Sequence, residues 1–363
     1  MSKARELAEL GAVYNSGALS NRNIIINGAM QIYQKGAGTY TNNNIALDRW
    51  KFTINGNDEA AGTITQVADA PSGFATSLKL TTTTAESAWA ANEYSHLSQL
   101  IEARNLQSFG WGTSSAKPLT LSFYVKSSVT GTFAVGIYKA DNQAVISNKT
   151  YTINSANTWE YKTVTFTANT TNDAINNDNG IGFYLNWHLA AGSDYTGGGS
   201  LTDWTNYGGD TFWANGQATN VLYTTNSSTW QLTGCQLEVG TEATPFEHRS
   251  FGDELARCKR YFERLLVDVN SSAFALGYGE GASQIRTPFK YETKRSNPSL
   301  AVSTAGNWEF VNGVESKTAS AVTGSALGKQ FGVIFGTVSG ATISRVYYAR
   351  ASAGEYIDLD SEL

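Results

Sequence analysis

The sequence predicts an all-β protein with a short N-terminal helix, a large antiparallel jelly-roll or β-sandwich domain, a connecting helix and a small C-terminal β-sandwich. Apolar and polar residues alternate over many short segments, as in Ile181, Phe183, Leu185 and Trp187, and this period of two is typical of half-buried strands. Turn clusters such as NNDNG at 176–180 separate the segments. The pattern offers no long amphipathic helices as crossovers, so we expect the strands to pair antiparallel.

The first 22 residues are expected to attach the chain to something else. Residues 3–10 (KARELAEL) are strong helix formers, but a helix of under about three turns is unstable alone in water. It needs a partner, either copies of itself or a docking site on another protein. The Gly-, Asn- and Ser-rich residues that follow are typical of a linker.

Residues 23–249 are predicted to form the large sandwich domain. Ile24–Ile26 and Met30 are expected in the core of its first strand. Near the end of this domain, the apolar residues of the alternating pattern first fall on even numbers, at Trp230 and Leu232. They then fall on odd numbers, at Cys235 and Leu237. A change of phase at Thr233-Gly234 predicts a β-bulge there.

A connecting helix is predicted over 250–266. Leu255, Cys258, Phe262 and Leu265 recur at helical spacing, with acidic residues early and basic residues later, the order that the helix dipole favours. Residues 267–363 return to alternating segments and form the expected C-terminal sandwich. The pair Asn312-Gly313 is a strong hairpin signal.

A glycine-rich stretch over 190–216 is predicted to be a long functional loop, because loops of this length in compact domains are usually functional or disordered, and disordered segments contain few aromatic residues. Its aromatic rings would stack on sugar rings and its carboxylates would bind hydroxyl groups. The alternative is that its tryptophans belong to the core. The candidate glycan-binding residues are Trp204, Trp213, Tyr195, Tyr207, Asp194, Asp203 and Asp210.

The composition argues against several classes of partner. The formal net charge is −5, and no Lys or Arg occurs between Lys162 and Arg249, so a nucleic-acid partner is not expected. Apolar runs are too short for membrane insertion, and the first residues do not resemble a signal peptide. Three His and two Cys argue against a zinc cluster or a disulfide scaffold. No cofactor is expected; an oxygen-rich edge at Asn23 and Asn27 leaves structural calcium open.

Catalysis is not expected. The sequence contains no nucleophile elbow, and His96, His188 and His248 are not spaced for a shared metal site. Glycoside hydrolysis needs two carboxylates at a defined separation, and spacing in the sequence does not show whether Asp194, Asp203 and Asp210 provide it.

Three stretches together resemble a family of bacteriophage tail-fibre proteins of marine and cyanobacterial phages. They are the opening SKARELAEL with NIIINGAM at 23–30, the tripeptide Asp48-Arg49-Trp50, and LTGCQLEVG at 232–240 running through ATPFEHR at 243–249 into ELARCKRYF at 254–262. The NGAM of the first stretch and the LTGCQLEVG of the third also resemble, more loosely, the ends of carbohydrate-binding jelly rolls. A polar network that joins the matched stretches is expected from Asp48, Arg49, Glu238, Glu247, His248 and Arg249.

The resemblance implies a homotrimeric fibre in the virion. It would attach to another tail protein through its N-terminal segment and bind a host surface polysaccharide, such as lipopolysaccharide, for adsorption. Three alternatives remain open at this point: a structural tail connector without a receptor site, a glycan depolymerase, and a carbohydrate-binding module of a secreted enzyme. The receptor site is expected either in the loop over 190–216 or in the C-terminal tip domain.

Overall fold

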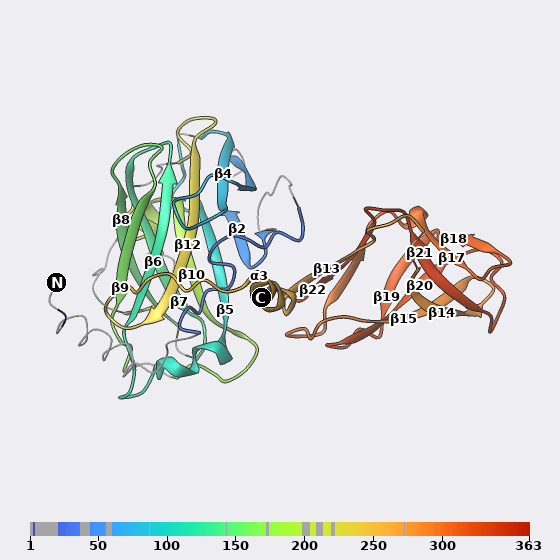
Figure 1. Ribbon diagram of the computed structural model, residues 1–363. Helices are drawn as coiled ribbons and strands as arrows, with labels where there is room; N and C mark the ends of the chain where they lie inside the picture. Colours follow the sequence, from blue (N-terminus) through green and yellow to red (C-terminus); the bar gives the residue numbers. More distant parts are fainter. Residues whose placement is uncertain are drawn as a thin grey trace. The chain divides into compact units, whose positions relative to one another are not determined.

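The structure is a computed structural model that describes residues 3, 21–36, 44–55, 60–86, 88–142, 144–171, 174–197, 204–207, 213–218, 222–271 and 273–363. Apart from Lys3, Asn21 and Arg22, the predicted attachment segment lies outside the described residues. The chain divides into two compact units, unit 1 up to Glu254 and unit 2 over Leu255–Glu362. Both are built of antiparallel strands (Figure 1), so the predicted all-β fold is confirmed.

Unit 1 is a sandwich of two antiparallel sheets, as predicted (Figure 1). In the described part of the chain, the larger sheet has the order β1 (Asn44–Leu47), β2 (Trp50–Asn55), β5 (Tyr94–Glu102), β10 (Ile181–Ala191), β7 (Gly131–Lys139), β8 (Val145–Ile153), β11 (Thr205–Asn206). The smaller sheet has the order β3 (Ala61–Val67), β4 (Ser77–Thr84), β12 (Thr229–Val239), β6 (Leu119–Ser127), β9 (Glu160–Phe166). The 3₁₀ helix η1 (Ala103–Phe109) follows β5.

The core of unit 1 lies between the two sheets and is rich in aromatic side chains. Trp187 of β10 packs on Trp50 of β2, with ring centroids 5.4 Å apart, and on Phe123 of β6, at 5.7 Å. All three rings are fully buried. Because the apolar residues of each strand alternate, one face of each sheet supplies this core.

The predicted β-bulge in the last strand of unit 1 is confirmed. The register of β12 against β6 shifts between Thr233 and Gln236, and Gly234 has a φ of +63°. A Cβ atom on Gly234 would also lie 2.7 Å from the ring of Phe74. The bulge changes the phase of the strand and so places Cys235 and Leu237 in the same core as Trp230.

Residues 21–36 do not form the first strand that we expected over Ile24–Ile26. Backbone pairing with β12 is limited to isolated contacts, such as Ile24 N to Leu237 O at 3.0 Å. Instead, side-chain amides hold the segment in place: Asn27 donates to the carbonyl oxygens of Ile32 and Asp48, at 2.8 and 3.0 Å. The segment still contributes Ile25 and Met30 to the core.

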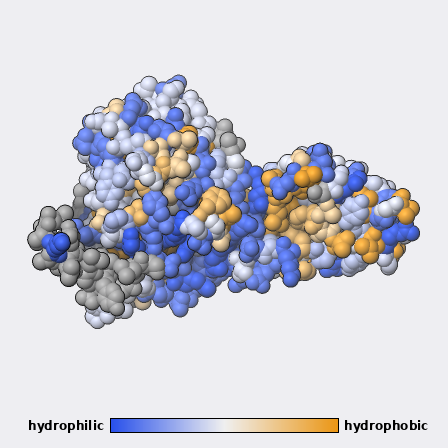
Figure 2. Space-filling view, viewed as in Figure 1, coloured by the Kyte–Doolittle hydropathy of each residue, from blue (hydrophilic) through white to orange (hydrophobic). Residues whose placement is uncertain are grey.

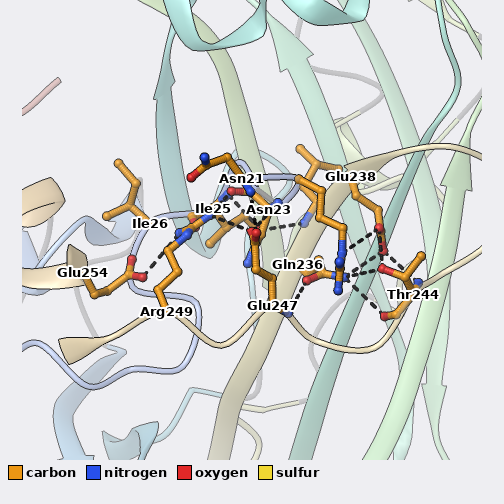
Figure 3. Close-up of polar contacts among 12 residues, drawn as sticks. Asn21, Asn23, Ile25, Ile26, Gln236, Glu238, Thr244, Glu247, Arg249 and Glu254 are labelled. Carbon is orange, nitrogen blue, oxygen red and sulfur yellow. Dashed lines mark hydrogen bonds and ion pairs between the residues drawn. The ribbon is translucent and has the colours of Figure 1, made fainter. Parts of the chain in front are cut away.

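A polar network fixes this segment to the end of unit 1, and Figure 3 shows its contacts. We call it the Arg249 network; its members are Asn21, Asn23, Gln236, Glu238, Thr244, Glu247, Arg249 and Glu254. The Arg249 guanidinium donates to the carbonyl oxygens of Asn23 and Ile25 and contacts both Glu247, at 3.4 Å, and Glu254, at 3.3 Å.

Glu247 completes the network, since its carboxylate accepts from the backbone nitrogens of Asn21 and Asn23 at 2.5 and 3.0 Å. Of the residues expected in a polar network, Glu238, Glu247 and Arg249 are therefore joined. Asp48 instead accepts from Gln34, and Arg49 donates to the carbonyl of Leu100. His248 packs on the ring of Phe74, at 5.3 Å.

The helix that follows is shorter than predicted. It is α3 (Phe251–Lys259), and residues 262–266 form the strand β13 (Phe262–Leu266). Phe262 and Leu265 fit a helical period, but the whole of β13 pairs with β22 (Tyr356–Asp360). Pairing with a strand about a hundred residues later in the chain overrides the local helical pattern.

Unit 2 consists of two antiparallel sheets (Figure 1). The smaller one, among the described residues, has the order β13, β22, β16 (Ser299–Val302). The larger one has the order β18 (Ser316–Thr318), β17 (Trp308–Val311), β21 (Val346–Ala351), β14 (Ala273–Gly281), β15 (Gln284–Lys290), β20 (Phe331–Thr337), β19 (Ala321–Ser325). The turn η3 (Ala305–Asn307) precedes β17.

The core of unit 2 forms on one face of the larger sheet. It contains Trp308, Phe310, Ile334 and Tyr347. Gly336 of β20 lies on this face, where a Cβ atom would be 2.0 Å from the ring of Phe310. The absence of a side chain at Gly336 thus admits a ring from the same unit.

Candidate functional site

The outer face of the larger sheet of unit 1, which points away from the sandwich core, carries an unusual set of side chains. Along β10, Phe183, Leu185 and Trp187 point into the core and are fully buried. Strand alternation places Tyr184, Asn186 and His188 on the other face. The outer face of this sheet therefore carries polar and aromatic side chains, while its inner face carries the apolar core.

The strand register brings matching residues of the neighbouring strands onto this face. His188 of β10 is paired with His96 of β5, and Asn186 with Ser98. On the other side of β10, Tyr184 is paired with Tyr138 of β7. Residues that are far apart in the sequence thus form rows across three adjacent strands.

The two histidines form the centre of an aromatic cluster. Their ring centroids are 5.7 Å apart, with an interplanar angle of 75°. Tyr94 stacks on His96 at 5.4 Å. Trp213 contacts both imidazoles, at 5.6 Å from His96 and 6.3 Å from His188.

A segment after β10 covers part of this face. The short helix α2 (Ser193–Thr196) places Tyr195 edge-on to Tyr94, with ring centroids 5.0 Å apart, and the Tyr195 hydroxyl donates to the Asn92 carbonyl at 3.0 Å. Gln217 is tied to β7, because its Oε1 accepts from the Ala134 nitrogen at 2.9 Å. Tyr207 packs on Tyr138, with ring centroids 4.9 Å apart.

We call this set the aromatic face of unit 1. Its members are Tyr94, His96, Tyr138, Tyr184, Asn186, His188, Tyr195, Tyr207, Trp213 and Gln217.

Several polar atoms of the aromatic face are buried without a hydrogen-bond partner among the described residues. They are Nδ1 of His96, Nδ1 and Nε2 of His188, Oδ1 of Asn186, Nε1 of Trp213 and Nε2 of Gln217. Buried polar groups in folded proteins are nearly always hydrogen-bonded to protein or to ordered water. These atoms therefore lack partners beneath the side chains of the face, where ordered water, or a polar ligand that moves part of this cover, would satisfy them.

Burial determines the charge state of the histidines. It lowers the pKa of His96 to about 3, with a smaller contribution from the positive charge of Lys51 on β2. Burial, and to a smaller extent the neighbouring His96, hold the pKa of His188 well below its ordinary value. Both imidazoles are thus neutral at physiological pH, and each has one nitrogen that donates and one that accepts.

This charge state predicts that acid destabilises unit 1. Below pH 6.5 the unfolded chain protonates His96 and His188 before the folded chain does, so stability that is complete above pH 6.5 is lost as the pH falls. We expect each histidine to lower the free energy of unfolding by about 1.4 kcal/mol per pH unit between pH 6.5 and the folded pKa. Urea unfolding at pH 7.5, 6 and 5 measures the slope.

The control for this pH dependence is a variant with both histidines replaced, His96→Gln and His188→Gln. It retains the carboxylates of the chain and should have a flatter dependence below pH 6.5. Equal slopes for the wild-type chain and this variant would contradict the assigned charge state.

The structure brings some of the predicted glycan-binding residues together and separates others. Tyr195, Tyr207 and Trp213 lie on the aromatic face, whereas Trp204 packs on Trp111 at the edge of the core, at 4.5 Å, and donates to the Thr167 carbonyl. Asp194 is exposed on α2, while Asp203 and Asp210 lie outside the described residues. The stretch over 190–216 is not one loop, since it includes the end of β10, α2 and β11.

The sequence alone did not identify the remaining residues of the face. Tyr94, His96, Asn186 and His188 occupy alternate positions of β5 and β10, a pattern that indicates a strand face without showing which strands are neighbours. Across the described residues, no group of three or more His, Cys, Asp or Glu is placed to hold a metal ion. In the same part of the chain, no helix is long and apolar enough to span a membrane.

No family model matches the sequence, and no curated protein matches it. Among solved structures, the chain is similar to the enzymatically active domain of tailspike protein 4 of bacteriophage CBA120. The two are 14% identical, the match covers 60% of this chain and 22% of that chain, and the TM-score is 0.33. This chain thus spans about a fifth of that domain's length.

Two further similarities are to proteins of Clostridium thermocellum. The family 11 carbohydrate-binding module of a cellulosomal cellulase shows 11% identity over 57% of this chain and 97% of that chain, with a TM-score of 0.29. The CBM22-1 and GH10 modules of a xylanase bound to xylohexaose show 12% identity over 60% and 30%, with a TM-score of 0.28. Similarities at this level carry no information about what this chain binds.

Proposed function

We propose that the aromatic face of unit 1 binds a neutral carbohydrate. The observation that carries the proposal is the group of buried, unpaired polar atoms on His96, Asn186, His188, Trp213 and Gln217, which lies among half-buried aromatic rings. A sugar matches both features. Its apolar C–H faces can stack on the rings, and its hydroxyl groups can donate to and accept from the polar atoms.

The chemistry of the face suits hydroxyl groups better than charged ligands. Neutral His188 offers a donor and an acceptor, Nδ1 of His96 offers one or the other, Asn186 offers an acceptor, and Trp213 and Gln217 offer donors. The rings of Tyr94, Tyr138, Tyr184, Tyr207 and Trp213 are half-buried and retain exposed surface for contact. Tyr and Trp provide large contact areas at a low cost in conformational entropy.

We further propose that the carbohydrate is bound and not cleaved. The residues of the aromatic face are rings, amides and neutral imidazoles, whereas glycoside hydrolysis in most families needs two carboxylates on either side of the scissile bond. Incubation of the protein with a bound polysaccharide, followed by an assay for new reducing ends, tests this point. A sustained release of reducing ends would favour the depolymerase alternative.

The finer proposal is a homotrimeric tail fibre that binds a host surface polysaccharide such as lipopolysaccharide. It is supported by the resemblance of the three sequence stretches to phage tail fibres. In the structure all three stretches meet, since Trp50 donates to the Asn27 carbonyl at 3.0 Å and Cys235 N donates to the Gly28 carbonyl at 2.9 Å. The matched residues thus act as scaffold, and a structural connector without a receptor site remains the second candidate.

A glycan array tests the proposal directly. We expect the purified full-length chain to bind a subset of neutral glycans on the array, and the binding to be insensitive to 0.5 M salt because no ion pairs are involved. Binding to charged glycans alone, with loss in salt, would contradict the neutral site. Failure to bind any glycan from a host envelope would favour the connector.

A further inference from the structure

The exposed apolar side chains of the protein are concentrated in unit 2. Of the large hydrophobic residues that are exposed in the described part of the chain, Tyr161 and Phe251 belong to unit 1. The others belong to the much shorter unit 2: Leu266, Val269, Leu276, Tyr278, Val314, Phe331, Ile343 and Val346. Figure 2 shows the hydrophobic surface of this unit.

Four of these side chains share one face of the larger sheet of unit 2. Across β14 and β21, Leu276 is paired with Tyr348 and Tyr278 with Val346. Antiparallel partners lie on the same face of a sheet. The buried Tyr347 and Ala349 alternate with them and point to the core, so Leu276, Tyr278 and Val346 lie on the opposite, outer face.

The same face continues across the next two strands. Tyr278 is paired with Arg286 of β15, and Arg286 is paired with Phe335 of β20. Phe331 follows on β20, opposite Lys290. We call this surface the outer apolar face; its members are Leu276, Tyr278, Phe331, Phe335, Val346 and Tyr348.

The exposed apolar area approaches the non-polar part of a standard protein interface. Leu276 is 66% exposed, Val346 60%, Phe331 47% and Tyr278 42%. Since side chains of this size have on the order of 150–250 Å² to bury, these four alone leave roughly 400 Å² of apolar surface uncovered. A standard interface buries about 800 Å² per partner, of which about 60% is non-polar.

The two arginines on this face are paired within the chain, whereas Lys290 of β15, exposed opposite Phe331, makes no ion pair with a described residue. Arg286 forms an ion pair with Glu280, at 3.2 Å, and its guanidinium lies 5.5 Å from the ring centre of Phe335. At β17 and β21, Arg350 forms an ion pair with Glu309, at 2.7 Å. With these two pairs formed, the region around Tyr278 and Phe335 carries little net charge, so it does not strongly repel an identical face.

We propose that the outer apolar face is the surface through which copies of this chain associate. The occupant is a second copy because the face is apolar, because Arg286 and Arg350 are already paired within the chain, and because the face can supply most of the non-polar area of an interface between identical subunits. The inference deepens the proposed oligomeric fibre by naming its contact surface. It does not depend on carbohydrate binding by unit 1.

Light scattering coupled to size exclusion, with the full-length chain at about 10 µM, tests the inference. We expect a mass of two or three times the chain mass of 39.1 kDa. Val346→Glu places a carboxylate in the proposed contact, and we expect it to weaken association at least 100-fold and to give the single-chain mass at this concentration. Leu276→Glu should act in the same way.

The matched control is Val314→Glu, which makes the same change at the tip of the turn between β17 and β18, where the side chain is 81% exposed. It should retain the mass of the wild-type chain. All of these positions are exposed, so the variants should melt at the wild-type temperature. A wild-type chain of single mass, or a Val346→Glu variant that retains the wild-type mass, would overturn the inference. Glycan binding, measured separately, reports only on unit 1.

Discussion

Replacing Arg249 with leucine is expected to lower the free energy of unfolding of unit 1 by about 3–5 kcal/mol, the usual cost of removing one partner from a buried ion pair. The Arg249 side chain is 8% exposed, and it contacts two carboxylates and two backbone carbonyls. Without it, Glu247 and Glu254 would both lose their ion-pair partner at the end of the sandwich. The carbonyls of Asn23 and Ile25 would also lose the guanidinium that they accept from.

The charge of Glu247 shows why the arginine is needed there. Burial alone would raise the pKa of this carboxyl, but the backbone N–H of Asn23 and the positive charge of Arg249 outweigh burial and hold the pKa below its ordinary value. A carboxylate that is kept ionised in this way depends on its cation. Arg249→Lys retains the positive charge but loses the planar guanidinium with its several N–H donors, so we expect an intermediate loss of stability.

Tryptophan fluorescence during urea unfolding measures this effect, because eight of the nine tryptophans belong to unit 1. The control is Lys79→Leu, which removes a positive charge from β4, where Lys79 makes no ion pair with a described residue. Such surface changes usually shift stability by within about 0.5 kcal/mol. If Arg249→Leu unfolded at the same urea concentration as Lys79→Leu, the Arg249 network would not stabilise the end of unit 1.

Replacing Trp213 with alanine is expected to weaken carbohydrate binding about 100-fold, since truncation of a central aromatic contact typically costs about 2–4 kcal/mol. The indole contacts both histidines and has a buried, unpaired Nε1. Its removal takes away a stacking surface and a hydrogen-bond donor together. Isothermal titration with the best ligand from the array measures the loss.

Trp204→Ala is the matched control for this prediction. The sequence suggests the same role for Trp204 and Trp213, but Trp204 packs on Trp111 and on Phe166, away from the aromatic face. We expect Trp204→Ala to lower the melting temperature and to keep the affinity. The reverse result, with affinity lost only in Trp204→Ala, would contradict the aromatic face and place the carbohydrate site near Trp204.

The sequence was sufficient for features that are encoded locally. The alternation at Phe183, Leu185 and Trp187 indicated both a strand and its buried face. The change of phase between Leu232 and Cys235 located a β-bulge, because an extra residue reverses the side-chain direction wherever the strand pairs. The fold class follows from many such segments, and each of them can be recognised without knowledge of its partner.

Tertiary structure alone decided which segments meet. Residues 262–266 fit a helix by period and became a strand because β22 is available for pairing. His96 and His188 are far apart in the sequence and adjacent in the sheet, and the outer apolar face arises only when β14, β15, β20 and β21 are aligned. The period of a strand is a property of its own residues, whereas its neighbour and register depend on the burial and hydrogen bonding of the whole sheet.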